Sequence, residues 1–89
     1  MNRRFSYAKN TSWGVINEEV FVFNETNGYI YLFKDLYKDV WLSIHCDNCV
    51  TTIISLLSKS NNTEEKELKN KVNIIIDNMF HKKLLIELK

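Results

Sequence analysis

The chain has 89 residues, of which 45% are hydrophobic and 26% are charged, a balance typical of one globular domain spanning residues 1–89. A chain this short buries only about 60–65% of its unfolded surface, so a deep enclosed active site is not expected. Twelve basic and eleven acidic residues give a net charge of +1. This near balance argues against a partner chosen mainly by bulk charge, such as nucleic acid or an anionic membrane.

No segment has the length or composition of a membrane anchor. The longest apolar runs, residues 20–23 and 29–33, are strand-sized, whereas a helix that spans a bilayer needs about 20 residues. The basic start at Arg3 and Arg4 leads into polar residues rather than into the apolar core of a signal peptide. We therefore expect a cytoplasmic protein with no membrane partner.

The first third of the chain has the pattern of β-strands. Aromatic and β-branched residues gather around residues 13–16, at 20–23 and at 29–33. Asn27 and Gly28 tolerate positive φ and suit the turn between the last two runs. The sequence predicts a three-stranded antiparallel meander.

From Asp35 onward the apolar period becomes helical, with Asp35 available as an N-cap. A second helix is expected over residues 50–57, and a third follows Asn62 and Glu65, which resemble a capping pair. The predicted fold is α+β and winged helix-turn-helix-like, a three-stranded antiparallel sheet followed by three helices. Its expected core residues are Trp41, Ile53, Leu57, Leu68, Val72 and Ile75. An apolar tail, residues 84–88, must also pack somewhere.

Cys46 and Cys49 form a C-x-x-C motif, which raises the question of a metal or redox site. A zinc site needs four ligands, and only the adjacent His45 and the distant His81 are available to complete one. A thioredoxin-like motif would follow a strand, whereas this one follows a helical pattern. We expect no metal and no cofactor.

Neither catalysis nor DNA binding finds a matching pattern of residues. No serine, cysteine and histidine are spaced as a nucleophile and its base, so no catalytic residues are predicted. A winged-helix transcriptional regulator is the alternative function, but the third helix mixes acidic and lysine residues and contains no arginine. The tip of the predicted hairpin carries the acidic residue Glu25 rather than a lysine or arginine that could contact phosphates. We therefore expect neither an enzyme nor a nucleic-acid partner.

The third predicted strand is unusual because it is apolar on both faces. Its residues are Tyr29, Ile30, Tyr31, Leu32 and Phe33. One interpretation is that residues 84–88 or a second copy of the chain, in a homodimer, cover the second face. The other is that the strand is an edge to which an incoming peptide adds as a further strand.

The segment from residue 20 to residue 57 resembles the PqqD-like family. This family includes the RiPP recognition elements, which bind leader peptides of ribosomally synthesised and post-translationally modified peptides, and the partner proteins of lasso-peptide leader peptidases. Its members run strand, Asn/Asp-x-x-x-Gly turn, strand ending in Leu-Asn, and helix with a central Ile/Val-Trp. Here these features are Asn24 to Gly28, Leu32 followed by Phe33, and Val40-Trp41. Phe33, Tyr37 and Asn48 depart from the family's usual residues, and we expect these departures to leave the peptide groove untouched.

The resemblance implies a peptide-binding domain in which a precursor leader peptide pairs antiparallel with the third strand. It places Tyr29 to Phe33 at the edge and Lys71, Ile74, Ile75 and Asn78 on the opposing wall. Chemistry would belong to a separate modifying enzyme, such as a radical S-adenosylmethionine enzyme, a cyclodehydratase or a leader peptidase. Proline at Tyr31 is expected to disrupt the pairing.

Overall fold

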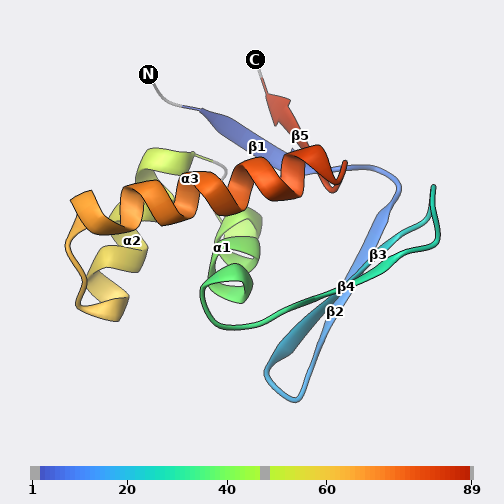
Figure 1. The fold of residues 1–89 in the computed structure, drawn as a ribbon, viewed down its shortest axis with the longest axis horizontal. Helices are drawn as coiled ribbons and strands as arrows, with labels where there is room; N and C mark the ends of the chain where they lie inside the picture. The colour runs from blue at the N-terminus through green and yellow to red at the C-terminus, as the bar shows by residue number, and fades with distance from the viewer. Residues whose placement is uncertain (1–2, 47–48, 89) are drawn as a thin grey trace.

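The computed structural model describes residues 3–46 and 49–88. Its elements are β1 (Arg4–Tyr7), β2 (Thr11–Ile16), β3 (Glu19–Asn24), β4 (Ile30–Phe33), α1 (Asp35–Cys46), α2 (Val50–Asn61), α3 (Glu65–His81) and β5 (Leu85–Leu88). Figure 1 shows the sheet of β2, β3 and β4 projecting from one side of the helices, with β1 and β5 beside the C-terminal half of α3. The predicted order of a three-stranded antiparallel sheet followed by three helices is confirmed.

The three-stranded sheet has the order β2-β3-β4, and β3 is its central strand. Both pairings are antiparallel, with Val22 opposite Trp13 on one side and Tyr31 on the other. Gly28 ends the β3–β4 turn with a φ of +77°, a conformation that glycine adopts without a steric penalty. The Asn-Gly signal in the sequence therefore marks the turn that sets the register of β4.

The inner face of this sheet packs on the helices. Side chains alternate along a strand, and those of Val20, Val22 and Phe33 are buried, whereas their neighbours on the other face are partly or largely exposed. The ring centroids of Phe33 and of Trp41 in α1 are 5.6 Å apart. The sheet and the helices thus share one apolar core, centred on the fully buried Trp41.

The three helices each bury one stripe. Every residue predicted from the helical period to be in the core is at most 6% exposed: Trp41, Ile53, Leu57, Leu68, Val72 and Ile75. Each such side chain contributes about 1.5–3 kcal/mol through burial of apolar surface. In the described part of the chain, no helix combines the length and the apolar character that crossing a membrane requires.

The apolar tail forms a strand that the sequence pattern did not predict. β5 pairs antiparallel with β1 in a separate two-stranded sheet, with Tyr7 opposite Leu85. Leu84 and Leu85 are buried, which explains the first part of this apolar segment, whereas Ile86 and Leu88 are exposed. The interpretation that residues 84–88 cover the second face of β4 is therefore wrong, because the tail is paired elsewhere.

Two helix boundaries also differ from expectation. Asn62 ends α2 rather than beginning α3: it has a left-handed φ of 56° and its N–H bonds to the carbonyl oxygen of Ser58. α3 instead starts from Glu64 as its N-cap. Asn tolerates left-handed backbone, which suits the end of a helix as well as its beginning. Asp35 has a positive φ of 51° at the start of α1.

Candidate peptide-binding groove

β4 is an edge strand, as the sequence predicted. It pairs with β3 on one side, and among the described residues no strand pairs with its other side. Tyr29 lies just before the strand, and its carbonyl oxygen accepts a hydrogen bond from the Asn24 N–H at 2.9 Å. An exposed edge of this kind presents unpaired backbone groups to an added strand.

The direction of the backbone groups along β4 follows from that bond. In an antiparallel pair, hydrogen-bonded and non-hydrogen-bonded positions alternate. Since Tyr29 is bonded to Asn24, the backbones of Tyr31 and Phe33 also face β3, and those of Ile30 and Leu32 face the free edge. A proline at Tyr31 would therefore break the sheet's own ladder. The position that tests strand addition is Leu32.

The side chains of β4 divide between the two faces of the sheet. Tyr31 is half-buried and Phe33 is buried, both on the inner face toward the helices. Ile30 and Leu32 lie on the outer face, where they are 67% and 46% exposed, and Tyr29 is exposed before the strand. An added strand would therefore bond to the backbones of Ile30 and Leu32, whose own side chains lie on the outer face, while the side chains of Tyr31 and Phe33 lie on the inner face.

The opposing wall is one stripe of α3. Lys71, Ile74, Ile75 and Asn78 follow at the i, i+3, i+4 and i+7 spacing that aligns side chains on a helix face. Ile74 is 61% exposed, whereas Ile75 is buried in the core. Asn78 donates a hydrogen bond from Nδ2 to the Tyr37 hydroxyl at 2.9 Å.

Two hollows connect this wall to β4. The first is lined by Tyr31, Leu32, Phe33, Lys34, Tyr37 and Lys82, and the second by Lys34, Asp35, Leu36, Tyr37, Lys71, Ile74 and Ile75. Because Lys34 and Tyr37 border both hollows, the two are adjacent, and together they extend from β4 past the start of α1 to α3. We call this pair of hollows the β4–α3 groove.

The structure brings most of the predicted site residues to the β4–α3 groove and adds others. Tyr31, Leu32, Phe33, Lys71, Ile74 and Ile75 line it, whereas Tyr29, Ile30 and Asn78 do not. Lys34, Tyr37 and Lys82 were not predicted. Lys82 lies eleven residues after Lys71, which is close to three helical turns. This spacing places it in line with the predicted wall and could have identified it as a site residue.

The departures from the family pattern do reach the groove. Phe33 and Tyr37 both line it, and their rings lie 5.6 Å apart between centroids. The expectation that these departures leave the groove untouched is therefore wrong for both. The physical reason is that the end of β4 and the first turn of α1, which carry these two residues, both border the groove. Asn48 lies outside the described residues.

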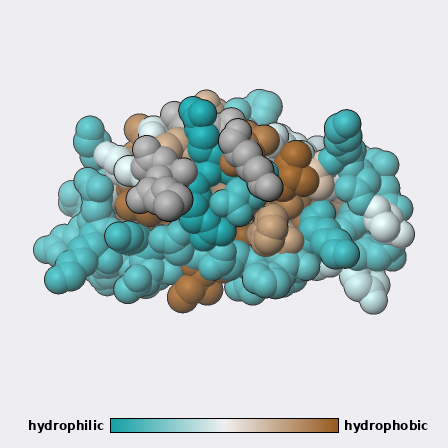
Figure 2. All heavy atoms as spheres, turned by 90° about the horizontal axis from the view of Figure 1, so that it is seen from above, coloured by the Kyte–Doolittle hydropathy of each residue, from teal (hydrophilic) through white to brown (hydrophobic). Residues whose placement is uncertain are grey.

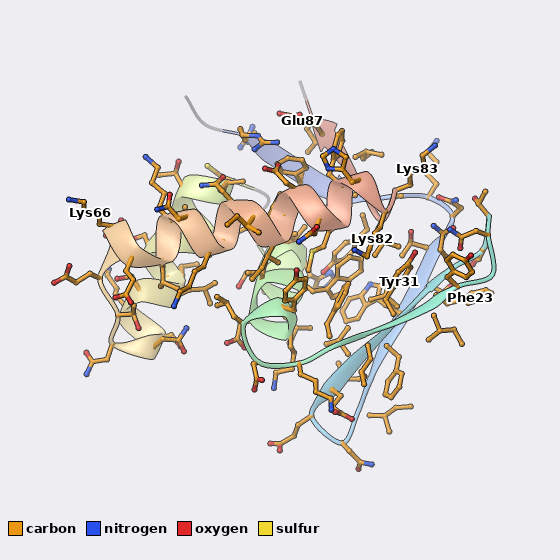
Figure 3. The ribbon with its side chains drawn as sticks, in the orientation of Figure 1. Phe23, Tyr31, Lys66, Lys82, Lys83 and Glu87 are labelled. Atoms are coloured by element: carbon orange, nitrogen blue, oxygen red, sulfur yellow. The ribbon has the colours of Figure 1, made fainter. Side chains whose placement is uncertain are left out.

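The groove carries more positive than negative charge. Lys34 contacts the Glu19 carboxylate at 2.9 Å, and this hydrogen bond raises the pKa of Lys34. Among the described residues, neither Lys71 nor Lys82 forms an ion pair. Figure 3 shows Lys82 extending from the end of α3 near Tyr31 of β4.

Outside the β4–α3 groove, the described residues form further open hollows on other parts of the surface. Within the described ranges, no three or more histidine, cysteine, aspartate or glutamate side chains gather as a metal site. Figure 2, a view onto the β1–β5 side of the molecule, shows mainly hydrophilic side chains with scattered apolar ones. On α3, Glu65, Lys66, Glu67 and Lys69 are exposed and mixed in sign, unlike a helix that reads DNA.

Comparison with protein-family models and with curated proteins finds no match to this sequence. Among solved structures, one described as TbiB1 in complex with the TbiA(beta) leader peptide is similar, with a TM-score of 0.85 over 90% of this chain and 93% of the matched chain. The chain has the fold of TbiB1. The two sequences are only 11% identical, so the likeness to TbiB1 lies in the arrangement of the backbone.

Proposed function

We propose that the chain binds the leader segment of a ribosomally made precursor peptide along β4 and presents it to a separate modifying enzyme. The observation that carries this proposal is the free edge of β4, where the backbones of Ile30 and Leu32 face away from β3 and where Leu32 borders the β4–α3 groove. The fold supports it, because TbiB1 has the same backbone arrangement and was solved with a leader peptide.

Strand addition accounts for both affinity and choice of peptide. Backbone hydrogen bonds to Ile30 and Leu32 fix the register of the added strand. Alternate side chains of the peptide then face the β4–α3 groove, where Ile74 offers exposed apolar surface and Tyr37 is one of the lining residues. The site therefore selects a short extended segment by a few side chains and not by bulk charge.

The chemistry belongs to the partner in this proposal. The groove is open and shallow, and among the described residues that line it no nucleophile is paired to a base. Holding the leader raises the effective concentration of the attached core peptide at a bound enzyme. A radical S-adenosylmethionine enzyme, a cyclodehydratase or a leader peptidase each fits this role, and the cytoplasm is where such a precursor is made.

Titration of labelled leader peptides tests the proposal. Short precursor genes beside the gene for this chain supply the candidate leaders, and fluorescence polarisation measures their binding to the full chain. We expect one leader to bind with only weak dependence on salt, whereas a DNA duplex of random sequence should bind negligibly at moderate salt. Steeply salt-dependent duplex binding, with no leader bound, would contradict the proposal and favour a transcriptional regulator.

A homodimer that pairs two β4 edges would compete for the same backbone groups. Sedimentation with and without leader peptide separates these states, because a peptide that occupies the edge should dissociate such a dimer. A dimer that survives saturation with the peptide uses another surface.

A further inference from the structure

Charge and spacing along the wall of the β4–α3 groove restrict the peptides that fit it. On this side the groove is bordered by Lys71, Ile74 and Ile75 of α3 and by Lys82, which directly follows the helix. The middle of this wall is apolar and each end carries a lysine. The two ends differ, however, because Asp35 lines the same hollow as Lys71, whereas none of the described residues that line the hollow with Lys82 is acidic.

The charges around the Lys82 end leave its ammonium group available. Lys34, the other cation of that hollow, is held by Glu19 at 2.9 Å. Lys82 is exposed and forms no ion pair in the described part of the chain. An acidic side chain seated beside Tyr31 would therefore meet an unneutralised cation rather than a competing carboxylate.

The direction of an added strand determines whether it meets Ile74 or Lys82 first. Figure 1 shows α3 and β4 running in opposite directions. A peptide antiparallel to β4 therefore runs parallel to α3, and it passes Ile74 before it reaches Lys82. Lys82 lies eight residues after Ile74, which corresponds to about 12 Å along the helix.

An extended chain advances about 3.3 Å per residue, so 12 Å corresponds to about four residues. Positions four apart in a strand project from the same face, which allows both side chains to face the groove. We infer that the bound segment carries an apolar residue opposite Ile74 and, about four positions later, an aspartate or glutamate opposite Lys82. This inference rests on the proposed function and specifies the peptide class.

Selection from a library of random dodecapeptides, displayed as fusions to their encoding RNA, tests the inference on the full chain without knowledge of the natural leader. Wild type should enrich peptides with an apolar residue followed about four positions later by Asp or Glu. Lys82→Glu should enrich Lys or Arg at the second position instead. Lys69→Glu is the matched control, because it makes the same charge change on α3 in a hollow formed with Thr51 and Ile54.

Affinity of the best wild-type peptide gives the quantitative test. At low salt, Lys82→Glu should weaken binding by about three- to tenfold, and the difference should shrink at about 0.3 M salt because the pair is solvent-exposed. Lys69→Glu should leave the affinity within about twofold of wild type.

Three outcomes separate the inference from the proposed function. An acidic preference that reverses in Lys82→Glu supports both. Peptides that bind wild type but not a folded Leu32→Pro variant, with no acidic preference, overturn the inference and leave edge binding intact. No enrichment, or binding unaffected by both Leu32→Pro and Ile74→Glu, contradicts the proposed function and the inference with it.

Discussion

Nδ2 of Asn78 lies 2.9 Å from the hydroxyl of Tyr37, and this hydrogen bond ties α3 to the first turn of α1 beneath the β4–α3 groove. Both side chains are half-buried. The Tyr37 ring also packs against Phe33 of β4. One residue of α1 thus links the two walls between which a peptide would lie, and its position depends on its bond to Asn78.

Tyr37→Phe should lower the free energy of unfolding by about 1 kcal/mol, because it removes this hydrogen bond and leaves the Asn78 amide without that partner. The ring contact with Phe33 is retained, so the core should stay packed. Urea unfolding measures the change. Asn73→Ala is the control, since the Asn73 side chain donates to the carbonyl oxygen of Lys69 on its own helix, at an exposed site. An equal loss in both variants would show that the bond between α1 and α3 has no special contribution.

Ile74→Glu and Ile75→Glu should separate binding from folding. Ile74 is 61% exposed, so a carboxylate there remains solvated and the variant should fold while losing affinity for the peptide. Ile75 is 5% exposed, so the same change buries a charge and should destabilise the fold by about 3 kcal/mol or more. Circular dichroism with urea unfolding, followed by peptide titration, distinguishes the two. Affinity within about twofold of wild type in folded Ile74→Glu would remove Ile74 from the site.

The sequence predicts those parts of the fold whose signals are local. The period of two over residues 13–33 and the turn at Gly28 give the three strands, and the helical stripe gives the core around Trp41. β1 and β5 escape prediction because each has four residues and its partner lies at the other end of the chain. No local pattern encodes such a pairing.

The groove was predicted in part for a related reason. Tyr31 and Ile74 stand out as apolar residues on a strand and a helix that the family resemblance brings together. Lys34 and Tyr37 belong to a third element, the β4–α1 junction, whose position depends on the left-handed φ of Asp35. The faces of β4 also needed the structure, because only the Asn24–Tyr29 bond shows which residues turn their backbone to the free edge.

Tyr7 should make stability fall at alkaline pH. Its ring stacks on Trp41 at 4.3 Å, its hydroxyl donates to the Trp41 carbonyl oxygen, and burial raises its pKa well above the ordinary 10.0. The unfolded chain therefore releases this proton at a lower pH than the folded chain does. The contribution to stability is constant below about pH 10 and is lost as the pH rises above it.

Urea unfolding at a series of values between about pH 8 and pH 11 measures this loss. Tyr7→Phe is the control: it starts less stable without the hydrogen bond to Trp41, but it lacks the titrating group, so its stability should fall less steeply. Parallel curves for the two proteins would show that other groups cause the alkaline loss.

Leu32→Pro should abolish peptide binding while the sheet remains folded. The backbone N–H of Leu32 faces the free edge, so proline removes a donor to the added strand without removing a bond to β3. Leu32→Ala is the matched control: it truncates the exposed side chain but keeps the N–H, so its affinity should fall much less than that of Leu32→Pro. Titration of the same peptide into both variants, with circular dichroism of each, makes the comparison. If folded Leu32→Pro and Leu32→Ala bind equally well, the peptide does not pair with the edge of β4, and the groove must hold it through side chains alone.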